Sequence, residues 1–341
     1  MSVTIAIKAL NEETAIRTAL ESAIAAAGSL GGKVVLADSI STDRTLTIAR
    51  SMTARIVQLA DPADRGCGAG AQLGYQAVDT PFFYLMDGDM ALLPKFLPSA
   101  LKWLEAHPDY AGVGGQVIER VVENEEFRIR AAAMEHEDHR REGPVDRLDG
   151  GGLYRTEAIR ALGYFCDRNL ASFEEFELAA RLHARGWKLG RVVLPAVEHS
   201  GHRGNGYRLM WERLRSGQLS GVGQVLRSAW GKPHMGFVLR RLTQVRSVAA
   251  TACWWVAIVV AVLTAPRYPA LPLLAFLLPA PVAALSWRRR SVRLGLYSFC
   301  YWNMAALGTI LGLFQRRLPP ELPLASVEIS PRDGFRQQGC A

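Results

Sequence analysis

Residues 213–320 contain no aspartate and no glutamate, although thirteen arginines and one lysine lie among them. This stretch alone carries a formal charge of +14 in a chain whose total is +8, so the first 212 residues are net acidic. A cationic segment of this kind can bind nucleic acid or anionic lipid. Because its arginines flank apolar runs instead of alternating with exposed aromatic and polar residues, the pattern favours membrane lipids as partners and argues against nucleic acid.

The chain also lacks the cysteine patterns of disulfide-stapled or zinc-binding proteins. Its five cysteines form neither a Cys-x-x-Cys pair nor a disulfide-framework spacing. The N-terminal segment MSVTIAIKALNEE has no basic region followed by an apolar signal core. We therefore expect the first domain to stay in the reducing cytosol. Charged residues make up only 21% of the chain and hydrophobic residues 49%, which is rich for a purely soluble protein.

Short β-rich segments alternate with helical patterns from residue 3 to about residue 120. The expected strands are VTIAIKA, KVVLADS, RIVQL, FFYLMDGD and AGVGGQVIE, and the expected helices between them cover 12–27, 43–54, 68–78 and 94–106. This alternation is typical of βαβ units, and it predicts an α/β fold with a mostly parallel sheet and helices on both faces. Residues 120–147 are charged and are expected to be helical or irregular. A glycine-rich loop and helix, a second helix (SFEEFELAARLHARG) and a strand (KLGRVVLPAVEH) follow.

Polar side chains gather at the carboxyl ends of the expected strands, where parallel sheets bind ligands. They are Asn11, Asp38, Asp87 and Asp89. The two aspartates flank Gly88 after a buried strand, and their hard oxygens could hold Mg²⁺ or Mn²⁺ while leaving coordination sites for diphosphate oxygens. The same residues could instead form a solvated Asp-Gly turn. Convergence of separate segments on one sheet edge favours the metal site.

The cationic part of the chain divides into basic amphipathic helices over 207–247, a membrane segment over 248–317 and a polar tail over 318–341. Three apolar stretches cover 248–265, 270–287 and 294–314. The first and third approach the ~20 residues needed to span a bilayer, whereas the second contains three prolines and could be a kinked span or a re-entrant arm. The sequence therefore leaves open whether the chain has two or three spans.

The arginines near these apolar stretches predict their orientation. Most of them flank the start of the first stretch and the end of the second, which predicts that the N-terminal domain lies on the cytoplasmic side of the cell inner (plasma) membrane. A third crossing would export Arg316 and Arg317, which favours two spans and an interfacial or re-entrant piece.

Taken in order, several segments resemble glycosyltransferase family 2, whose members have the GT-A fold. They are VTIAIKALNEE, LADSISTDRT, RGCGAGAQLGYQAV, FYLMDGDM, GGGLYR and FEEFELAARLHARGWKLG. The resemblance covers about residues 3–205 and assigns a GT-A glycosyltransferase domain to 1–206. It implies transfer of a sugar from a nucleotide-sugar donor, with inversion at the anomeric carbon and a divalent cation, Mn²⁺ or Mg²⁺, held by Asp87 and Asp89. Asp87 would be shared between metal and ribose.

Glu174 and Glu175 occupy the place of the family's acidic pair, in which the second residue is the catalytic base. An acceptor hydroxyl has a high pKa and needs a positioned base as it attacks the sugar. Glu175 is therefore the candidate base, and we expect burial and Glu174 to raise its pKa. An acidic first turn that favours the helix dipole is the alternative interpretation.

The resemblance implies further binding residues. Asn11, Glu12 and Asp38 match nucleoside-binding positions, although Asn11 is also a good helix N-cap. Arg65 could present a cation to the diphosphate, and Gly151 could line the donor sugar, or both could belong to flexible loops and turns.

A histidine completes the metal or diphosphate site in related enzymes. Of His199 and His202, His199 is favoured by sequence order. Arg181 matches the family's arginine in the acidic-pair helix, where it would bind substrate or orient Glu177 or Glu175.

The sequence departs from the family pattern in two places. Lys8 and Leu10 replace the usual proline and aromatic residue, and Asp38-Ser39-Ile40-Ser41 replaces Asp-Asp-Gly-Ser, so the base and the sugar are less defined than the reaction class. No Gln-x-x-Arg-Trp string is present, which favours addition of a single sugar.

These observations predict a metal-dependent, hexosyltransferase-type enzyme that acts on a lipid-linked or glycan acceptor in cell-envelope polysaccharide or glycolipid synthesis. The alternatives are a polyprenyl-phosphate sugar transferase and a non-catalytic subunit that binds sugar nucleotides in an assembly.

Overall fold

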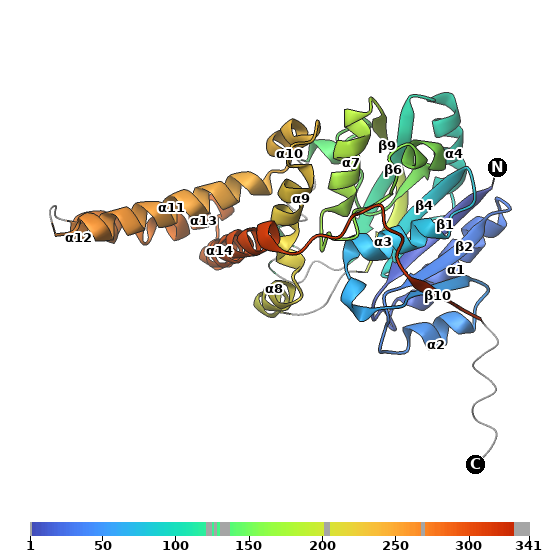
Figure 1. Cartoon of the computed structure of the whole chain (residues 1–341), viewed down its shortest axis with the longest axis horizontal. Helices are drawn as coiled ribbons and strands as arrows, with labels where there is room; N and C mark the ends of the chain where they lie inside the picture. Colours follow the sequence, from blue (N-terminus) through green and yellow to red (C-terminus); the bar gives the residue numbers. More distant parts are fainter. Residues whose placement is uncertain are drawn as a thin grey trace, which may run out of the picture. The chain divides into compact units, whose positions relative to one another are not determined.

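The computed structural model describes residues 2–120, 125, 128–129, 137–200, 205–266 and 270–330. They form two compact units (Figure 1). Unit 1 comprises residues 1–122, 133–202 and 317–341, and unit 2 comprises 123–132 and 203–316. The chain therefore passes from unit 1 to unit 2 twice, at 123–132 and at 203–316, and returns to unit 1 each time. Much of the stretch over 120–147 that was expected to be helical or irregular lies outside the described residues.

Unit 1 is built on one mixed sheet. Its strands run in the spatial order β10-β3-β2-β1-β4-β8-β6-β9-β5, and β7 pairs with β9. The pairs β1–β2, β2–β3, β1–β4 and β6–β9 are parallel. All the strands expected from the sequence form, with ends shifted by two residues at most. The strands are β1 (Val3–Ala9), β2 (Lys33–Asp38), β3 (Arg55–Leu59), β4 (Phe82–Asp87), β5 (Met90–Leu92), β6 (Tyr110–Glu119), β7 (Gly143–Val145), β8 (Gly152–Arg155), β9 (Lys188–His199) and β10 (Ser326–Ile329).

Helices cover both faces of this sheet because its central strands are apolar on both sides. In β4, Phe82, Tyr84 and Met86 pack with residues of α1 and α4, whereas Phe83 and Leu85 pack on the opposite face with residues of α3, α6 and α7. This alternation follows the period of two residues along a strand. The helices are α1 (Ile16–Gly28), α2 (Thr45–Arg50), α3 (Cys67–Gln76), α4 (Phe96–Ala106), α6 (Thr156–Arg160) and α7 (Glu174–Ala184), with short 3₁₀ turns η1 (Pro62–Asp64) and η2 (Asp138–Arg140).

The C-terminal segment returns to unit 1 and adds β10 to its sheet. β10 pairs antiparallel with β3, in register from Ser326 opposite Leu59 to Ile329 opposite Ile56. Before the strand, Leu318 exchanges two hydrogen bonds with the side chain of Asn169, at 2.8 and 2.9 Å. The expectation of a plain polar tail did not anticipate this strand.

Unit 2 is helical. Its elements are α8 (Gly206–Arg215), η3 (Gln218–Ser220), α9 (Gly221–Ala229), α10 (Met235–Arg241), α11 (Gln244–Thr264), α12 (Ala270–Leu277), α13 (Ala280–Arg289) and α14 (Val292–Phe314). Two stretches of the described residues, Gln244–Thr264 and Leu271–Arg289, are long and apolar enough to cross a membrane.

These two stretches are the first and second of the three expected from the sequence, whereas the first and third were expected to be nearest the spanning length. The third, α14, packs against α13, α9, η3 and α11. The approach is so close that a Cβ on Gly308 would lie 2.5 Å from the carbonyl oxygen of Leu219.

Candidate active site

A buried ammonium group links two acidic residues at the carboxyl edge of the sheet. Lys8 on β1 lies in register with Asp87 at the end of β4. Its Nζ is 3.1 Å from Oδ1 of Asp87 and 2.5 Å from Oε1 of Glu174, the first residue of α7. Lys8 thus joins the aspartate pair to the acidic pair, which lies some ninety residues further along the chain. The sequence analysis treated Lys8 only as a departure from the family pattern.

Asp89 and His199 lie side by side, as the metal-site prediction requires. The β5–β9 pairing places them there, because Met90 lies opposite His199 in the register. His199 Nε2 is 3.0 Å from Asp89 Oδ2, and its Nδ1 is 2.5 Å from Glu119 Oε2. Burial lowers the pKa of His199, but the hydrogen bonds to the two carboxylates raise it to about 10.

Glu119 was missed by the sequence analysis. It ends strand β6 and lies in register with His199, so the rule that found Asp38 and Asp87 at strand ends would also have found Glu119. His202 lies outside the described residues.

The acidic side chains at this edge outnumber the positively charged ones, Lys8 and His199. Glu12 packs against Gly88, where a Cβ would lie 3.0 Å from Glu12 Cγ. Burial, together with the charges of Asp89 and Asp87, raises the pKa of Glu12 to about 8. Carboxylate oxygens suit Mg²⁺ or Mn²⁺, and so does Nε2 of His199 once a bound cation has displaced its proton; the cation would also relieve the repulsion among the acids. The residues therefore fit a divalent cation, although the carboxylate of Asp87 is turned toward Lys8.

The acidic pair, Glu174 and Glu175, begins α7, and the pKa values of its two residues are shifted in opposite directions. Burial raises the pKa of Glu174, but the charge of Lys8 outweighs it and lowers the pKa below its usual value. Burial and the charge of Glu174 raise the pKa of Glu175 to about 8, against the opposing charge of Lys8. Phe173, just before the helix, has a φ of 64°, a strained left-handed conformation of the kind that gathers at functional sites.

Asn11 and Asp38 lie at neighbouring strand ends. Asn11 has a φ of 59°, and its Oδ1 accepts a hydrogen bond of 2.8 Å from the backbone N–H of Thr42. Asp38 is buried, and its Oδ2 accepts from Ser41 N at 3.0 Å and from Gln58 Nε2 at 2.8 Å. Its Oδ1 is buried and has no hydrogen-bond partner within the part of the chain that the structure describes. An unmet buried acceptor is costly and suits a ligand N–H or O–H group.

The remaining predicted residues have structural partners. Arg65 donates hydrogen bonds to the backbone carbonyls of residues 39 and 40, at 2.9 and 2.5 Å, and so braces the loop after β2. Arg181 is buried and pairs with Glu177 at 2.8 Å, which agrees with an orienting role rather than substrate contact. Gly151 has a φ of 94°, and a Cβ there would lie 2.7 Å from Tyr84 Oη, so only glycine fits this turn.

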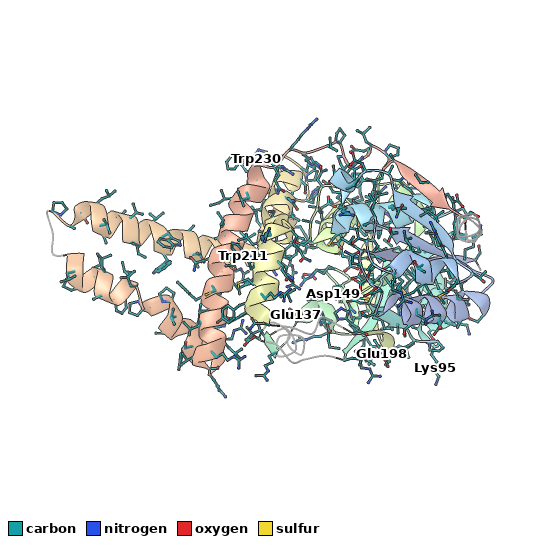
Figure 2. The ribbon with its side chains drawn as sticks, turned by 90° about the horizontal axis from the view of Figure 1, so that it is seen from below. Lys95, Glu137, Asp149, Glu198, Trp211 and Trp230 are labelled. Carbon is teal, nitrogen blue, oxygen red and sulfur yellow. The ribbon has the colours of Figure 1, made fainter. Side chains whose placement is uncertain are left out.

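A second acidic group lies elsewhere in unit 1. Ligand atoms of Glu137, His139 and Asp149 lie within 4.8 Å of one another. Figure 2 labels Glu137 and Asp149. Two guanidinium groups already meet Asp149, Arg140 at 2.7 Å and Arg191 at 2.8 Å. Because these arginines neutralise the acids without a metal, we regard the group as an ion-pair network.

Comparison with known proteins supports the fold and the family. Residues 4–163 match the model of the family described as Glycosyl transferase family 2. The mannosyltransferase PcManGT from Pyrobaculum calidifontis, solved with GDP-Man and Mn²⁺, is 20% identical and superposes with a TM-score of 0.58 over 90% of this chain and 86% of its own. The comparison with curated protein sequences finds no match.

Other solved structures are more distant. S. aureus TarS 1-349 in complex with UDP-GlcNAc is 15% identical, with a TM-score of 0.49 over 93% of both chains. The match to a longer S. aureus TarS chain covers 44% of that chain. Glucosyl-3-phosphoglycerate synthase from Mycobacterium tuberculosis, solved with Mn²⁺, UDP and phosphoglyceric acid, is 20% identical, with a TM-score of 0.47 over 68% of this chain and 79% of its own.

The sheet topology and the PcManGT superposition define a GT-A nucleotide-diphospho-sugar transferase fold. Residues 4–163 match the model of glycosyl transferase family 2, so the predicted resemblance to that family is confirmed over this segment, and the predicted fold is confirmed. The roles of individual site residues stay predictions.

Proposed function

We propose that the protein is an inverting glycosyltransferase that moves a hexose from a nucleotide-sugar to a hydroxyl group of a lipid-linked or glycan acceptor at the cytoplasmic face of a membrane. The observation that carries the proposal is the grouping at one sheet edge. There Asp89 contacts His199, while Lys8 links Asp87 to Glu174 beside Glu175. A cation-binding set and a candidate base thus lie at the edge where such sheets bind ligands.

The donor would lie along the ends of β1, β2 and β4. Asp38 offers an unmet buried acceptor for a nucleobase N–H or a ribose hydroxyl, and Asn11 and Glu12 lie at the neighbouring strand end. PcManGT holds GDP-Man and Mn²⁺ in a similar fold, and we extend the classes of donor and cation, but not the mannose or the guanine, to this chain.

A divalent cation would be held by Asp89 and His199 together with Asp87, and when bound it would neutralise charge on the departing nucleoside diphosphate. Glu119 fixes the ring of His199 through its Nδ1, so that Nε2 faces Asp89. Such support of a metal-binding histidine is common and holds the ring in one orientation.

Glu175 would take the proton of the acceptor hydroxyl. Its pKa of about 8 makes it a stronger base than a surface glutamate while leaving part of it ionised near neutral pH. Glu174 stays ionised against Lys8, so the two neighbouring acids have different tasks.

The test is a screen of nucleotide-sugars against the full chain in detergent, with thermal stabilisation and Mn²⁺-dependent hydrolysis as readouts. We expect one donor to stabilise the protein only when the cation is present. The proposal is wrong if no nucleotide-sugar does so. Binding of a donor with no hydrolysis or transfer would identify the non-catalytic subunit instead.

The polyprenyl-phosphate transferase remains the nearest rival, and Glu175→Gln separates it from our proposal. A phosphate acceptor is already an anion and needs little help from a base, so the substitution should barely slow that enzyme. A loss of ~10²-fold or more would support a hydroxyl acceptor.

A further inference from the structure

We propose that α11 and the kinked helix formed by α12 and α13 cross a lipid bilayer as a two-span hairpin, and that α14 stays on the side of unit 1. This inference rests on the membrane attachment in the proposed function and is independent of the transfer chemistry. It favours two spans over three, because the chain returns to unit 1 after the hairpin.

The returning C-terminal segment fixes the number of crossings as even. Residues 317–330 fold into unit 1 through β10, through the bonds of Leu318 and through further contacts. Arg317 meets the fully buried carboxylate of Asp167 at 2.8 Å, and Gln76 exchanges two hydrogen bonds with the backbone of Leu324. One folded unit lies on one side of a membrane, so the intervening chain must begin and end on the same side.

Two stretches of the described chain have the length and composition for the crossings. At 1.5 Å per residue, the 21 residues of Gln244–Thr264 extend ~31 Å and the 19 of Leu271–Arg289 extend ~28 Å, close to the hydrocarbon thickness of ~30 Å. Within unit 2, α12 at the start of the second stretch packs against α11. The two stretches expose large apolar side chains: Val256, Val259, Val260, Leu263, Leu271, Leu273 and Phe276.

At the break between α12 and α13, a side chain replaces a missing backbone hydrogen bond, as the interior of a membrane requires. Pro281 has no N–H, so the carbonyl of Leu277, four residues earlier, loses its helical donor. The indole Nε1 of Trp254, on α11, donates to this carbonyl at 2.8 Å. An unpaired carbonyl in hydrocarbon costs several kcal/mol, so this bond suits a hairpin that lies inside a bilayer.

α14 is long enough to span a bilayer, with 23 residues, but one of its faces packs against α9, η3, α11 and α13 of unit 2. Gly308 and Gly312 press against η3, and Gln315, just after the helix, bonds with Gln224 of α9 at 2.5 Å. A crossing by α14 would also make the number of spans odd.

Charge gives an independent reason for the same arrangement. Arginines lie before α11 and after α13, whereas the connection between α11 and α12 contains only one, Arg267. This bias places both ends of the hairpin at the cytoplasmic face, beside anionic lipid headgroups. Outside α11, the described part of unit 2 also exposes Trp211, Trp230 and Trp287, a residue type enriched at the membrane surface; Trp211 and Trp230 are labelled in Figure 2. The occupant of the exposed apolar surface is therefore a bilayer.

The experiment is single-cysteine labelling of the full chain with a membrane-impermeant maleimide, in inverted and right-side-out vesicles, on a background with the five cysteines changed to serine. Lys95→Cys reports unit 1, Leu322→Cys the returning segment and Thr264→Cys the far end of the hairpin. We expect Lys95→Cys and Leu322→Cys to label at least tenfold faster in inverted vesicles, and Thr264→Cys to show the opposite preference.

Each other outcome overturns the inference. If all three cysteines are labelled from the same side of the membrane, the helices lie on the surface or re-enter. If Lys95→Cys and Leu322→Cys are labelled from opposite sides, the number of spans is odd. Recovery of the chain without membranes excludes a hairpin altogether.

Trypsin treatment of wild-type vesicles provides a second measurement should the cysteine-free variants fail to fold. The hairpin predicts that trypsin in inverted vesicles spares Arg267 while it cuts at Arg288–Arg290. Cleavage at Arg267 from that side would contradict it. Neither measurement depends on sugar transfer, so failure here and failure of the proposed function are distinguishable.

Discussion

The ion pairs of Lys8 give the most quantitative prediction about the site. Lys8→Met keeps the length and the apolar stem of the side chain but removes the ammonium from between Asp87 and Glu174. The Lys8 side chain is 17% exposed and that of Glu174 is 10% exposed, so water screens their interaction poorly. Removing one partner of a buried pair costs ~3–5 kcal/mol. We take the lower end, ~3 kcal/mol, because Asp87 is 41% exposed and regains hydration.

This cost should appear as a fall in melting temperature. For a domain of about 200 residues each kcal/mol shifts Tm by ~2–4 °C, so Lys8→Met should lower Tm by ~6–12 °C. The assay is thermal unfolding of the full chain in detergent, followed by circular dichroism.

The matched control is Lys33→Met on the neighbouring strand β2. Lys33 lies 2.5 Å from Asp79, but both side chains are 60% exposed, so its loss should cost less than ~1 kcal/mol. If Lys8→Met melts within ~1 °C of Lys33→Met, the inference that Lys8 ties the two acidic motifs together is wrong.

Three further predictions concern the base, the hairpin and the returning segment. Because Glu175 must be ionised to accept a proton and its pKa is raised to about 8, kcat/KM should rise about tenfold per pH unit below pH 8 and level off above it; a flat profile from pH 6 to 8 would exclude Glu175 as the base. Trp254→Phe leaves a helix carbonyl unpaired and should destabilise unit 2 by ~1–2 kcal/mol in detergent unfolding. Trp255→Phe, which loses only a bond to a side-chain amide, is its control, and equal losses would remove the role given to Trp254. Arg317→Ala leaves the fully buried Asp167 without its ion pair and should cost ~3 kcal/mol, measured by urea unfolding; an unchanged midpoint would show that the returning segment does not hold to unit 1.

The α/β fold was predictable because its signal is local. Strands buried on both faces read as continuous apolar runs, and the run over Phe82–Asp87 became β4, with alternate residues packed on the two faces. The strand β10 was not predictable in this way, because it is short and its pairing with β3 is a tertiary event.

The residues of the candidate site were likewise predictable only where their signal is local. Asp89 and His199 were both chosen from the sequence, since each ends a recognisable segment, and they lie in contact. The part played by Lys8 depends on the register of β1 against β4 and on the placement of α7, which no local pattern specifies. For the same reason the sequence did not reveal that Arg65 braces a loop through two backbone carbonyls.

The central claim is that Asp89 and His199 hold a cation that in turn binds a nucleoside diphosphate. Calorimetric titration of the full chain in detergent with UDP and with GDP, each with Mn²⁺ and with EDTA, tests it most directly. For one nucleotide, we expect binding that weakens at least tenfold both with EDTA and in Asp89→Asn, but not in the control Asp79→Asn. Equal affinity with and without Mn²⁺, or undiminished binding by Asp89→Asn, would contradict it.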